Sequence, residues 1–299
     1  MKRNLFYSMI IGMIICLFIA CNNDDFIDDG MDINGYEPSF NDTLAVPTES
    51  VYLGDSIQLM KSFDLNQYPV GKLTVSTTEN GYIAVLGGYK QYSAVYVYAK
   101  LEEELPKLTN EEIKALLNKY YLIESHLDGK EIVVTIKENT NIAHGNDFHK
   151  LRISIKAFTP CNVSTQLNIS KGNIFINNLN GELHEASLSS GSIKYLDSRG
   201  KKIQIESQNG FIGLINTIAS ENIDVKLTKG SIQIAVPQTT RATLALQSTT
   251  SVNAYVLDNL NFEGKRTQTL VKGKLNGGGY SINAVASLGN VTFRWYDKK

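Results

Sequence analysis

Four glycines recur at nearly constant spacing in the C-terminal half of the chain. Gly172, Gly191, Gly210 and Gly230 are 19, 19 and 20 residues apart, and an isoleucine stands two positions after each of them. A repeat of this length indicates one short structural unit stacked on copies of itself. We therefore expect a fold built by repetition, with a core that runs through the stack.

Apolar residues alternate on both sides of each marker glycine. The residues two and four positions after it are apolar in all four units, and so is the residue five positions before it. Period-two alternation is typical of a strand with one face on a core. Each unit is predicted to be two short strands joined by a turn at the glycine, where the missing Cβ permits positive φ. The predicted turn glycines are Gly172, Gly181, Gly191, Gly200, Gly210, Gly230 and Gly289.

The same residue type recurs in the same column, so the four isoleucines can lie over one another at about 4.8 Å per coil. This favours a mainly β fold, a parallel β-solenoid or β-helix with coils of 19 to 20 residues. The solenoid is predicted to be right-handed, as most parallel β connections are. The stack is expected to span residues 161–299 and to continue through Thr250 and Gly289, with one degraded coil from Asn261 to Gly273 looping out. An antiparallel sandwich with hairpins of similar length is the alternative.

Residues 51–160 are predicted to form a β-rich segment that is interrupted by one helix and is continuous with the repeats. Short runs dense in Val, Ile and Tyr indicate the strands. Thr109 and Glu112 have the spacing of a capping box, and apolar residues then follow at helical spacing, which predicts a helix at about 109–121. Asp128 and Gly129 indicate a hairpin turn.

The N-terminus is that of an exported protein. Lys2 and Arg3 precede an apolar stretch that ends at Ala20, too short to span a bilayer, so residues 1–20 are interpreted as a signal peptide. The sequence at Cys21 resembles a bacterial lipobox, which predicts lipidation of Cys21 and anchoring in a membrane; an ordinary cleavage site with an incidental Cys21 is the alternative. Residues 21–50, polar and acidic at their start, are expected to be a tether. The acidic pair Asp24 and Asp25 resembles an export signal to the outer face of the outer membrane.

Composition excludes some functions. The formal net charge is −1 and no long basic run occurs, so no nucleic-acid partner is expected. Downstream of Cys21 only Cys161 remains, and we expect it to be a small buried residue without an intramolecular disulfide, rather than a nucleophile or redox thiol.

Three segments resemble the bacterial "putative adhesin" family of β-strand repeats, a domain of unknown function related to the head region of some autotransporter adhesins. They are Asn168 to Ile174, Leu188 to Ile193 and Thr228 to Ile232, and the resemblance extends from about Phe63 to Phe293. It implies a structural repeat and an adhesive role, and it implies no catalytic residues.

No catalytic or metal site is predicted. His144, Asp147 and His149 share one loop, but their spacing matches no standard ligand set and no further ligand is evident, so a solvated loop is the expectation. The repeat's carboxylates are expected to be scattered without a shared column, and no nucleophile motif occurs. No cofactor is implied. The carboxylates considered are Glu182, Glu185, Asp197, Glu206, Glu221 and Asp224.

These observations favour a lipid-anchored cell-surface protein that binds a glycan or an extracellular protein without catalysis. Tyrosines between residues 82 and 98 are predicted to cover the sheet, with stacking on sugars as the alternative. A carbohydrate-active enzyme and a structural envelope lipoprotein are the other functions considered. The residues expected to point outward for contact are Phe175, Lys194, Gln204, Gln233 and Asn253.

Overall fold

The computed structural model describes residues 55–59, 63–64, 70–88, 92–103, 106–259 and 261–296. All of them belong to one compact unit, Asp32–Lys299. The predicted signal peptide, Cys21 and the tether up to residue 50 lie outside the described residues. The strands are β1 Asp55–Leu59, β2 Phe63–Asp64, β3 Lys72–Leu86, β4 Tyr92–Leu101, β5 Tyr121–Asp128, β6 Glu131–Glu138, β7 Leu151–Phe158, β8 Ser164–Asn177, β9 Leu183–Leu196, β10 Arg199–Ile215, β11 Ile218–Val236, β12 Ala242–Ser248, β13 Ser251–Asn253, β14 Phe262–Arg266, β15 Leu270–Leu275 and β16 Tyr280–Trp295; the helices are α2 Asn110–Tyr120 and the short 3-10 helix η3 Tyr255–Asn259.

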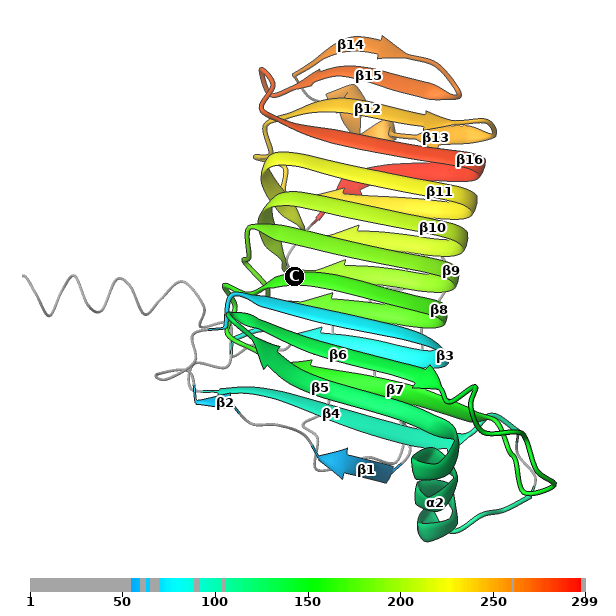
Figure 1. Ribbon diagram of the computed structural model, residues 1–299. Coiled ribbons are helices and arrows are strands. Elements are labelled where there is room, and N and C mark those ends of the chain that lie inside the picture. The colour runs from blue at the N-terminus through cyan, green and yellow to red at the C-terminus, as the bar shows by residue number, and fades with distance from the viewer. Residues whose placement is uncertain are drawn as a thin grey trace, which may run out of the picture. The chain divides into compact units, whose positions relative to one another are not determined.

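The described strands form one large and mostly parallel sheet. Strands β8, β9, β10 and β11 follow one another in parallel, and residues 19 or 20 positions apart pair along the whole length of each strand (Figure 1). The marker glycines pair with one another, as do the isoleucines two positions later. All four isoleucines are fully buried. The column predicted from the repeat is therefore present.

Each marker glycine bends a strand that continues through it. At Gly191, for example, φ is +135° and a Cβ would lie 1.6 Å from the carbonyl oxygen of Gly172 in the preceding coil. Glycine is thus needed both for the positive φ and for the close approach of two backbones. The units are not pairs of strands separated by a turn, because β9 runs unbroken from Leu183 to Leu196.

At the opposite corner of the repeat, the residues with positive φ are Asn and Asp in place of Gly. Asn178, Asp197 and Asn216 have φ between +47° and +56°, and they stand 19 residues apart. Asn and Asp tolerate this region because their short side chains hydrogen-bond locally. Gly181 and Gly200 lie close to this corner without positive φ; a Cβ on Gly181 would lie 2.5 Å from the carbonyl oxygen of Val163, and one on Gly200 would lie 3.0 Å from the His184 ring.

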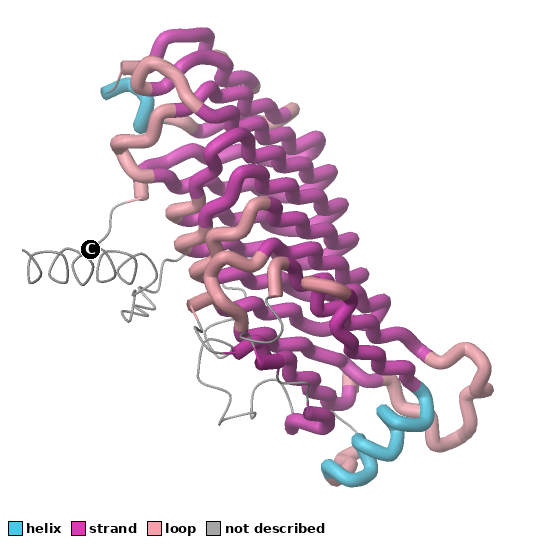
Figure 2. The backbone as a smooth tube through the Cα atoms, turned by 60° about the vertical axis from the view of Figure 1, so that its left-hand side comes forward, coloured by secondary structure: helices cyan, strands magenta, loops and turns pink. Residues whose placement is uncertain are grey.

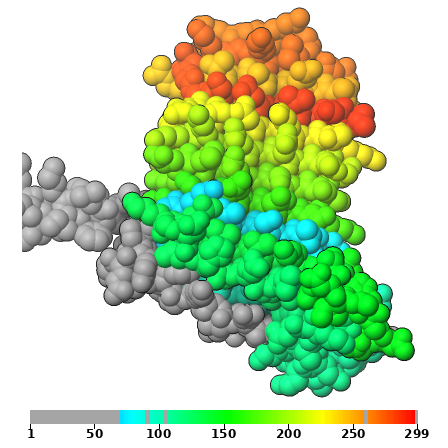
Figure 3. All heavy atoms as spheres, viewed as in Figure 1, coloured from blue at the N-terminus to red at the C-terminus, as the bar shows by residue number. Residues whose placement is uncertain are grey.

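The order of strands in space departs from their order in the chain at both ends of the stack. β16 lies between β11 and β12, so that Gly289 pairs with Gly230 (Figure 1). In Figure 3 its red band separates the yellow band of β11 from the orange bands above it. The expectation that the coil after Thr250 precedes the coil of Gly289 in the stack is therefore wrong.

β3 is inserted in the same way. Its first half pairs with β6, its second half pairs with β7, and its other edge pairs with β8. The β-rich segment and the repeats thus share one sheet. Helix α2 lies at the end of the stack near β4 and β5 (Figure 2). The capping box expected from Thr109 and Glu112 is present, and Gly129, with φ +59°, lies in the turn of the β5–β6 hairpin.

Candidate functional site

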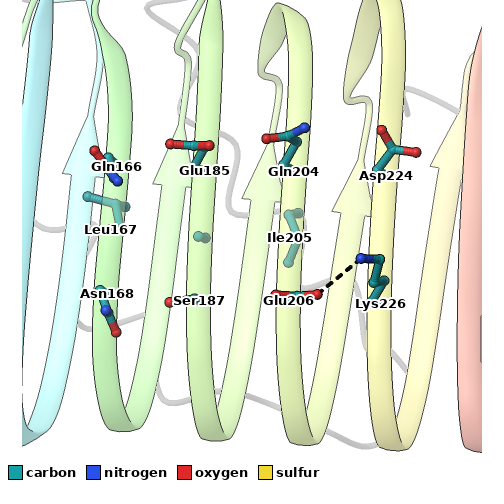
Figure 4. Close-up of a pocket in the computed structure, with 11 residues that line it drawn as sticks. Gln166, Leu167, Asn168, Glu185, Ser187, Gln204, Ile205, Glu206, Asp224 and Lys226 are labelled. Atoms are coloured by element: carbon teal, nitrogen blue, oxygen red, sulfur yellow. Dashed lines mark hydrogen bonds and ion pairs between the residues drawn. The ribbon is translucent and has the colours of Figure 1, made fainter.

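The outer face of the first halves of β8 to β11 is polar. Leu167 and Ile205 point into the core from these strands, and the residues on either side of them point outward (Figure 4). Because the four strands pair in register, the outward side chains form two rows that cross the strands. We call this surface the polar face: the row Gln166, Glu185, Gln204 and Asp224, and the row Asn168, Ser187, Glu206 and Lys226 (Figure 4).

Two hollows lie on the polar face. The first has a volume of about 350 Å³ and includes all eight residues of the two rows. The second, of about 580 Å³, shares Asn168, Ser187, Glu206 and Lys226 with it and extends to Val285 and Ser287 on β16. The polar face is therefore concave in two places, and amides, hydroxyls and carboxylates form most of the lining.

The charges of the polar face are mostly acidic. The Lys226 ammonium lies 3.2 Å from the Glu206 carboxylate, and both side chains are largely exposed. Asp224 accepts a hydrogen bond of 2.7 Å from the Asn283 amide. Glu185 has no ion pair with any described residue. With three carboxylates and one ammonium, the face can accept hydrogen bonds from hydroxyl or ammonium groups of a ligand.

Two of the carboxylates lie in the same row of the polar face, so the expectation that no carboxylates share a column is wrong. Glu185 pairs with Gln204, which pairs with Asp224, so the two acids stand two strands apart in one row. At the usual strand spacing their backbones are about 9.6 Å apart. Glu185 and Asp224 each stand six positions before a marker glycine, Gly191 and Gly230, so counting from those glycines places them in one row.

The second halves of β8, β10 and β11 are buried on both faces. Phe175 and Gln233, expected to be available for contact, are 0% and 1% exposed, whereas Gln204 and Asn253 are exposed and Lys194 is half-buried. Phe175 packs with Leu86 and Phe158 in a cluster separate from the main core. Unbroken apolar runs such as Phe211 to Ile215, in place of alternation, are the sequence signal of burial on both faces.

Two of the tyrosines between residues 82 and 98 contribute to this second cluster, and Tyr89 and the Tyr92 side chain lie outside what the structure describes. Tyr82 and Tyr96 pack against it, and the Tyr96 ring meets the Phe158 ring edge-on at 5.8 Å. Tyr98 is buried. These three rings therefore cover the sheet and present no open stacking platform.

The loop that contains His144 is held by side chains of the chain itself. His144 Nε2 lies 2.8 Å from Glu138, and its ring stacks on Phe148. Asp147 accepts hydrogen bonds from Lys119 and Tyr120, which lower the pKa of its carboxyl to about 2. Nowhere in the described ranges do three or more metal-ligating side chains gather.

Two buried titratable groups escaped the sequence analysis. His184 is fully buried; its Nε2 lies 2.9 Å from the carbonyl oxygen of Arg199 and its Nδ1 lies 3.0 Å from the Thr165 hydroxyl. Burial lowers its pKa to about 4, so the ring is neutral and structural at physiological pH. Lys156 is also fully buried, beside the Phe158 ring, and burial lowers its pKa to about 8.

Cys161 also differs from its prediction. It is half-buried, whereas a buried residue was expected. The other two cysteines, Cys16 and Cys21, lie outside the described residues. Within the described part of the chain, no helix is long and apolar enough to cross a membrane.

Three solved structures resemble this chain at low sequence identity. A "putative cell adhesion protein" from Clostridium sporogenes is 13% identical over 79% of this chain and 97% of its own, with a TM-score of 0.45. A "putative adhesin" from Bacteroides fragilis is 14% identical over 79% and 96%, with a TM-score of 0.26. A "putative lipid binding protein" from Parabacteroides distasonis is 11% identical over 80% and 96%, with a TM-score of 0.29. No TM-score reaches 0.5, so no conclusion rests on these likenesses.

The sequence comparison with protein families is stronger. No curated protein matches the chain. The family model described as Toastrack DUF4097 matches residues 131–294, from the start of β6 almost to the end of β16. This is more than half of the 299 residues. The chain therefore belongs to the Toastrack DUF4097 family.

Proposed function

We propose that this protein is a lipid-anchored cell-surface module that binds a glycan or an extracellular protein through its polar face, without catalysing a reaction. The observation that carries the proposal is the pair of polar rows over two hollows, in register across four strands. Rigid strands hold these side chains at fixed spacing, which suits recognition of an extended ligand. No reaction is assigned to this face.

Binding is tested with the full chain, purified in detergent, on an array of glycans and extracellular-matrix proteins. We expect a saturable hit that the double variant Gln166→Ala/Gln204→Ala weakens, because both amides line the first hollow. The matched control is Gln238→Ala/Gln268→Ala, which removes two exposed amides elsewhere. Silence across the array, or equal loss in both variants, refutes binding through the polar face and favours a structural envelope role.

Anchoring and surface display are tested in cells. The lipobox-like sequence at Cys21 motivates both claims. We expect Cys21→Ala to release the protein from membranes and to abolish metabolic labelling with a fatty acid. External proteinase should digest the wild-type protein on intact cells, and protection from it would refute surface display.

One observation favours a second candidate function, a carbohydrate-active enzyme. The backbones of Glu185 and Asp224 are about 9.6 Å apart in one row, a spacing from which two side chains can reach the carboxyl separation of about 6.5 to 9.5 Å that inverting glycosidases use. The test is to incubate the protein with a polysaccharide that it binds on the array. Release of reducing sugar by the wild type, and no release by Glu185→Gln, would replace the binding proposal with this one.

A further inference from the structure

Cations gather at the end of the sheet formed by β12, β15 and β14. Lys265 on β14 pairs with Lys272 on β15, and Lys274 pairs with Thr243 on β12. These side chains are exposed, and their neighbours Leu244, Val271 and Leu275 are buried, so the lysines lie on the outer face. Arg241, just before β12, is also exposed and lies close to the turn at Gly277. We call Arg241, Lys265, Lys272 and Lys274 the basic patch.

The basic patch has one acidic neighbour on its strands, Glu263, which pairs with Lys274 across β14 and β15. Elsewhere on the stack some exposed lysines pair with a carboxylate of the adjacent coil, as Lys201 does with Glu182 and Lys226 with Glu206. Among the described residues no ion pair involves any member of the patch, and Glu263 is the only carboxylate on the strands β12, β14 and β15. Since the whole chain carries a formal net charge of −1, the patch is a strong local asymmetry.

Folding alone does not explain this arrangement. Lys265 and Lys272 stand directly opposite each other in an antiparallel pair, where like charges destabilise the sheet. Lysines on an edge strand discourage pairing with other chains, and β14 is the last strand of the sheet. That role accounts for Lys265. Lys274 stands opposite Glu263, an opposite-charge pair that stabilises the sheet. Neither role accounts for Lys272 and Arg241, which lie on or beside strands with neighbours on both sides.

We propose that the basic patch binds an acidic polysaccharide, one that carries carboxylate or sulfate groups. The cations lie on a flat sheet surface at strand spacing, so successive anionic groups of an extended polymer can each meet one. Thr243 and Gln247, exposed on the same side of β12, supply hydrogen bonds to sugar hydroxyls.

Other polyanions fit this surface less well. None of the described outward side chains of β12, β14 and β15 is aromatic, whereas single-stranded nucleic acid is usually held by stacking on aromatic rings. Leu270 is the one large apolar residue on that side and it is half-buried, so little apolar surface is available to insert into a membrane. The patch lies on different strands from the polar face, and its failure leaves the proposed function standing.

The test measures binding of the full chain, in detergent at low ionic strength, to immobilised heparin and polygalacturonate. Uncharged dextran, duplex DNA and nanodiscs containing phosphatidylglycerol are run in parallel. We expect saturable binding to at least one acidic polysaccharide that weakens as salt is added. No binding to either polysaccharide, equal binding to DNA, or binding to the nanodiscs alone overturns the proposal.

Variants locate the site. We expect Lys265→Gln/Lys272→Gln/Lys274→Gln to weaken binding roughly tenfold or more, because three charge-assisted contacts are lost. The matched control is Lys107→Gln/Lys114→Gln/Lys137→Gln, which removes the same charge from exposed positions far along the chain. Equal weakening in both variants means that only net charge matters and overturns the site. Thermal unfolding of each variant verifies that it is folded.

Discussion

At Gly191 the place where a side chain would begin is already occupied by the neighbouring coil. The carbonyl oxygen of Gly172 lies 1.6 Å from the position of an added Cβ, and the same relation recurs along the glycine column at 1.6 to 1.9 Å. A backbone atom cannot rotate away as a side chain can. The glycines recur at nearly constant spacing because each one contacts the backbone of the neighbouring coil at a point where no Cβ fits.

Gly191→Ala should be among the most damaging single substitutions in the chain. Relief of the clash requires two paired strands to separate locally, and alanine also resists a φ of +135°. We expect a loss of about 3 kcal/mol or more in the free energy of unfolding, measured by urea denaturation. Gly129→Ala is the control, since Gly129 has φ +59° but nothing within 4 Å of the added Cβ. We expect it to cost only about 1 to 2 kcal/mol, and equal costs would contradict the clash argument.

His184 makes the stability of the stack depend on pH. Burial lowers its pKa from 6.5 to about 4, so the unfolded chain binds more protons than the folded chain between these values. The free energy of unfolding should therefore fall as pH falls through this window, by about 2 kcal/mol between pH 7 and pH 4.5.

Substitution of His184 isolates this contribution. We expect His184→Gln to unfold with a shallower dependence on pH than the wild type, measured by urea denaturation at several pH values. His126→Gln, at an exposed position on β5, should leave the slope unchanged. Parallel slopes in the wild type and the His184 variant would show that the buried imidazole is not responsible.

At the scale of elements, short sequence patterns correctly predicted one helix and the repeated strands. The capping box and the apolar spacing located helix α2, and the isoleucine column located the paired strands β8 to β11. Both signals depend on residues within one unit or on a repeat that can be counted. Outward burial was harder to predict. Phe175 lies on the outward side of its strand, as alternation predicts. That side is nevertheless buried, because Phe175 packs with Leu86 and Phe158 from other strands.

The candidate site was only partly predictable. Gln204 was identified as an outward residue, because alternation assigns each residue of a strand to one face. The grouping of the polar rows depends on register between strands. The row of Glu185 and Asp224 was accessible from the sequence, because each stands six positions before a marker glycine. The basic patch was not accessible in this way, since its lysines are separated in the chain and meet only through the β14–β15 pairing.

At the scale of the molecule, two insertions make the stack less modular than a simple repeat. In a sequential solenoid each coil contacts only its neighbours in the chain, and the ends can be removed with local effect. Here β3 is paired with β8, and β16 is paired with both β11 and β12. Segments distant in the chain must therefore meet before the sheet is continuous, which is expected to slow folding.

Removal of residues 280–299 tests this topology, because it deletes an internal strand although it trims only the C-terminus. Ile282, Val291 and Phe293 would leave the core, and β11 and β12 would both lose a parallel partner. We expect the shortened chain to aggregate, or to lose protection from amide hydrogen exchange in β11, β12 and β15 together. A chain that ends at residue 296 keeps all of β16 and is the control. Protection of β12 and β15 equal to that of the control would mean that these strands do not depend on β16, and that the stack follows the order of the chain.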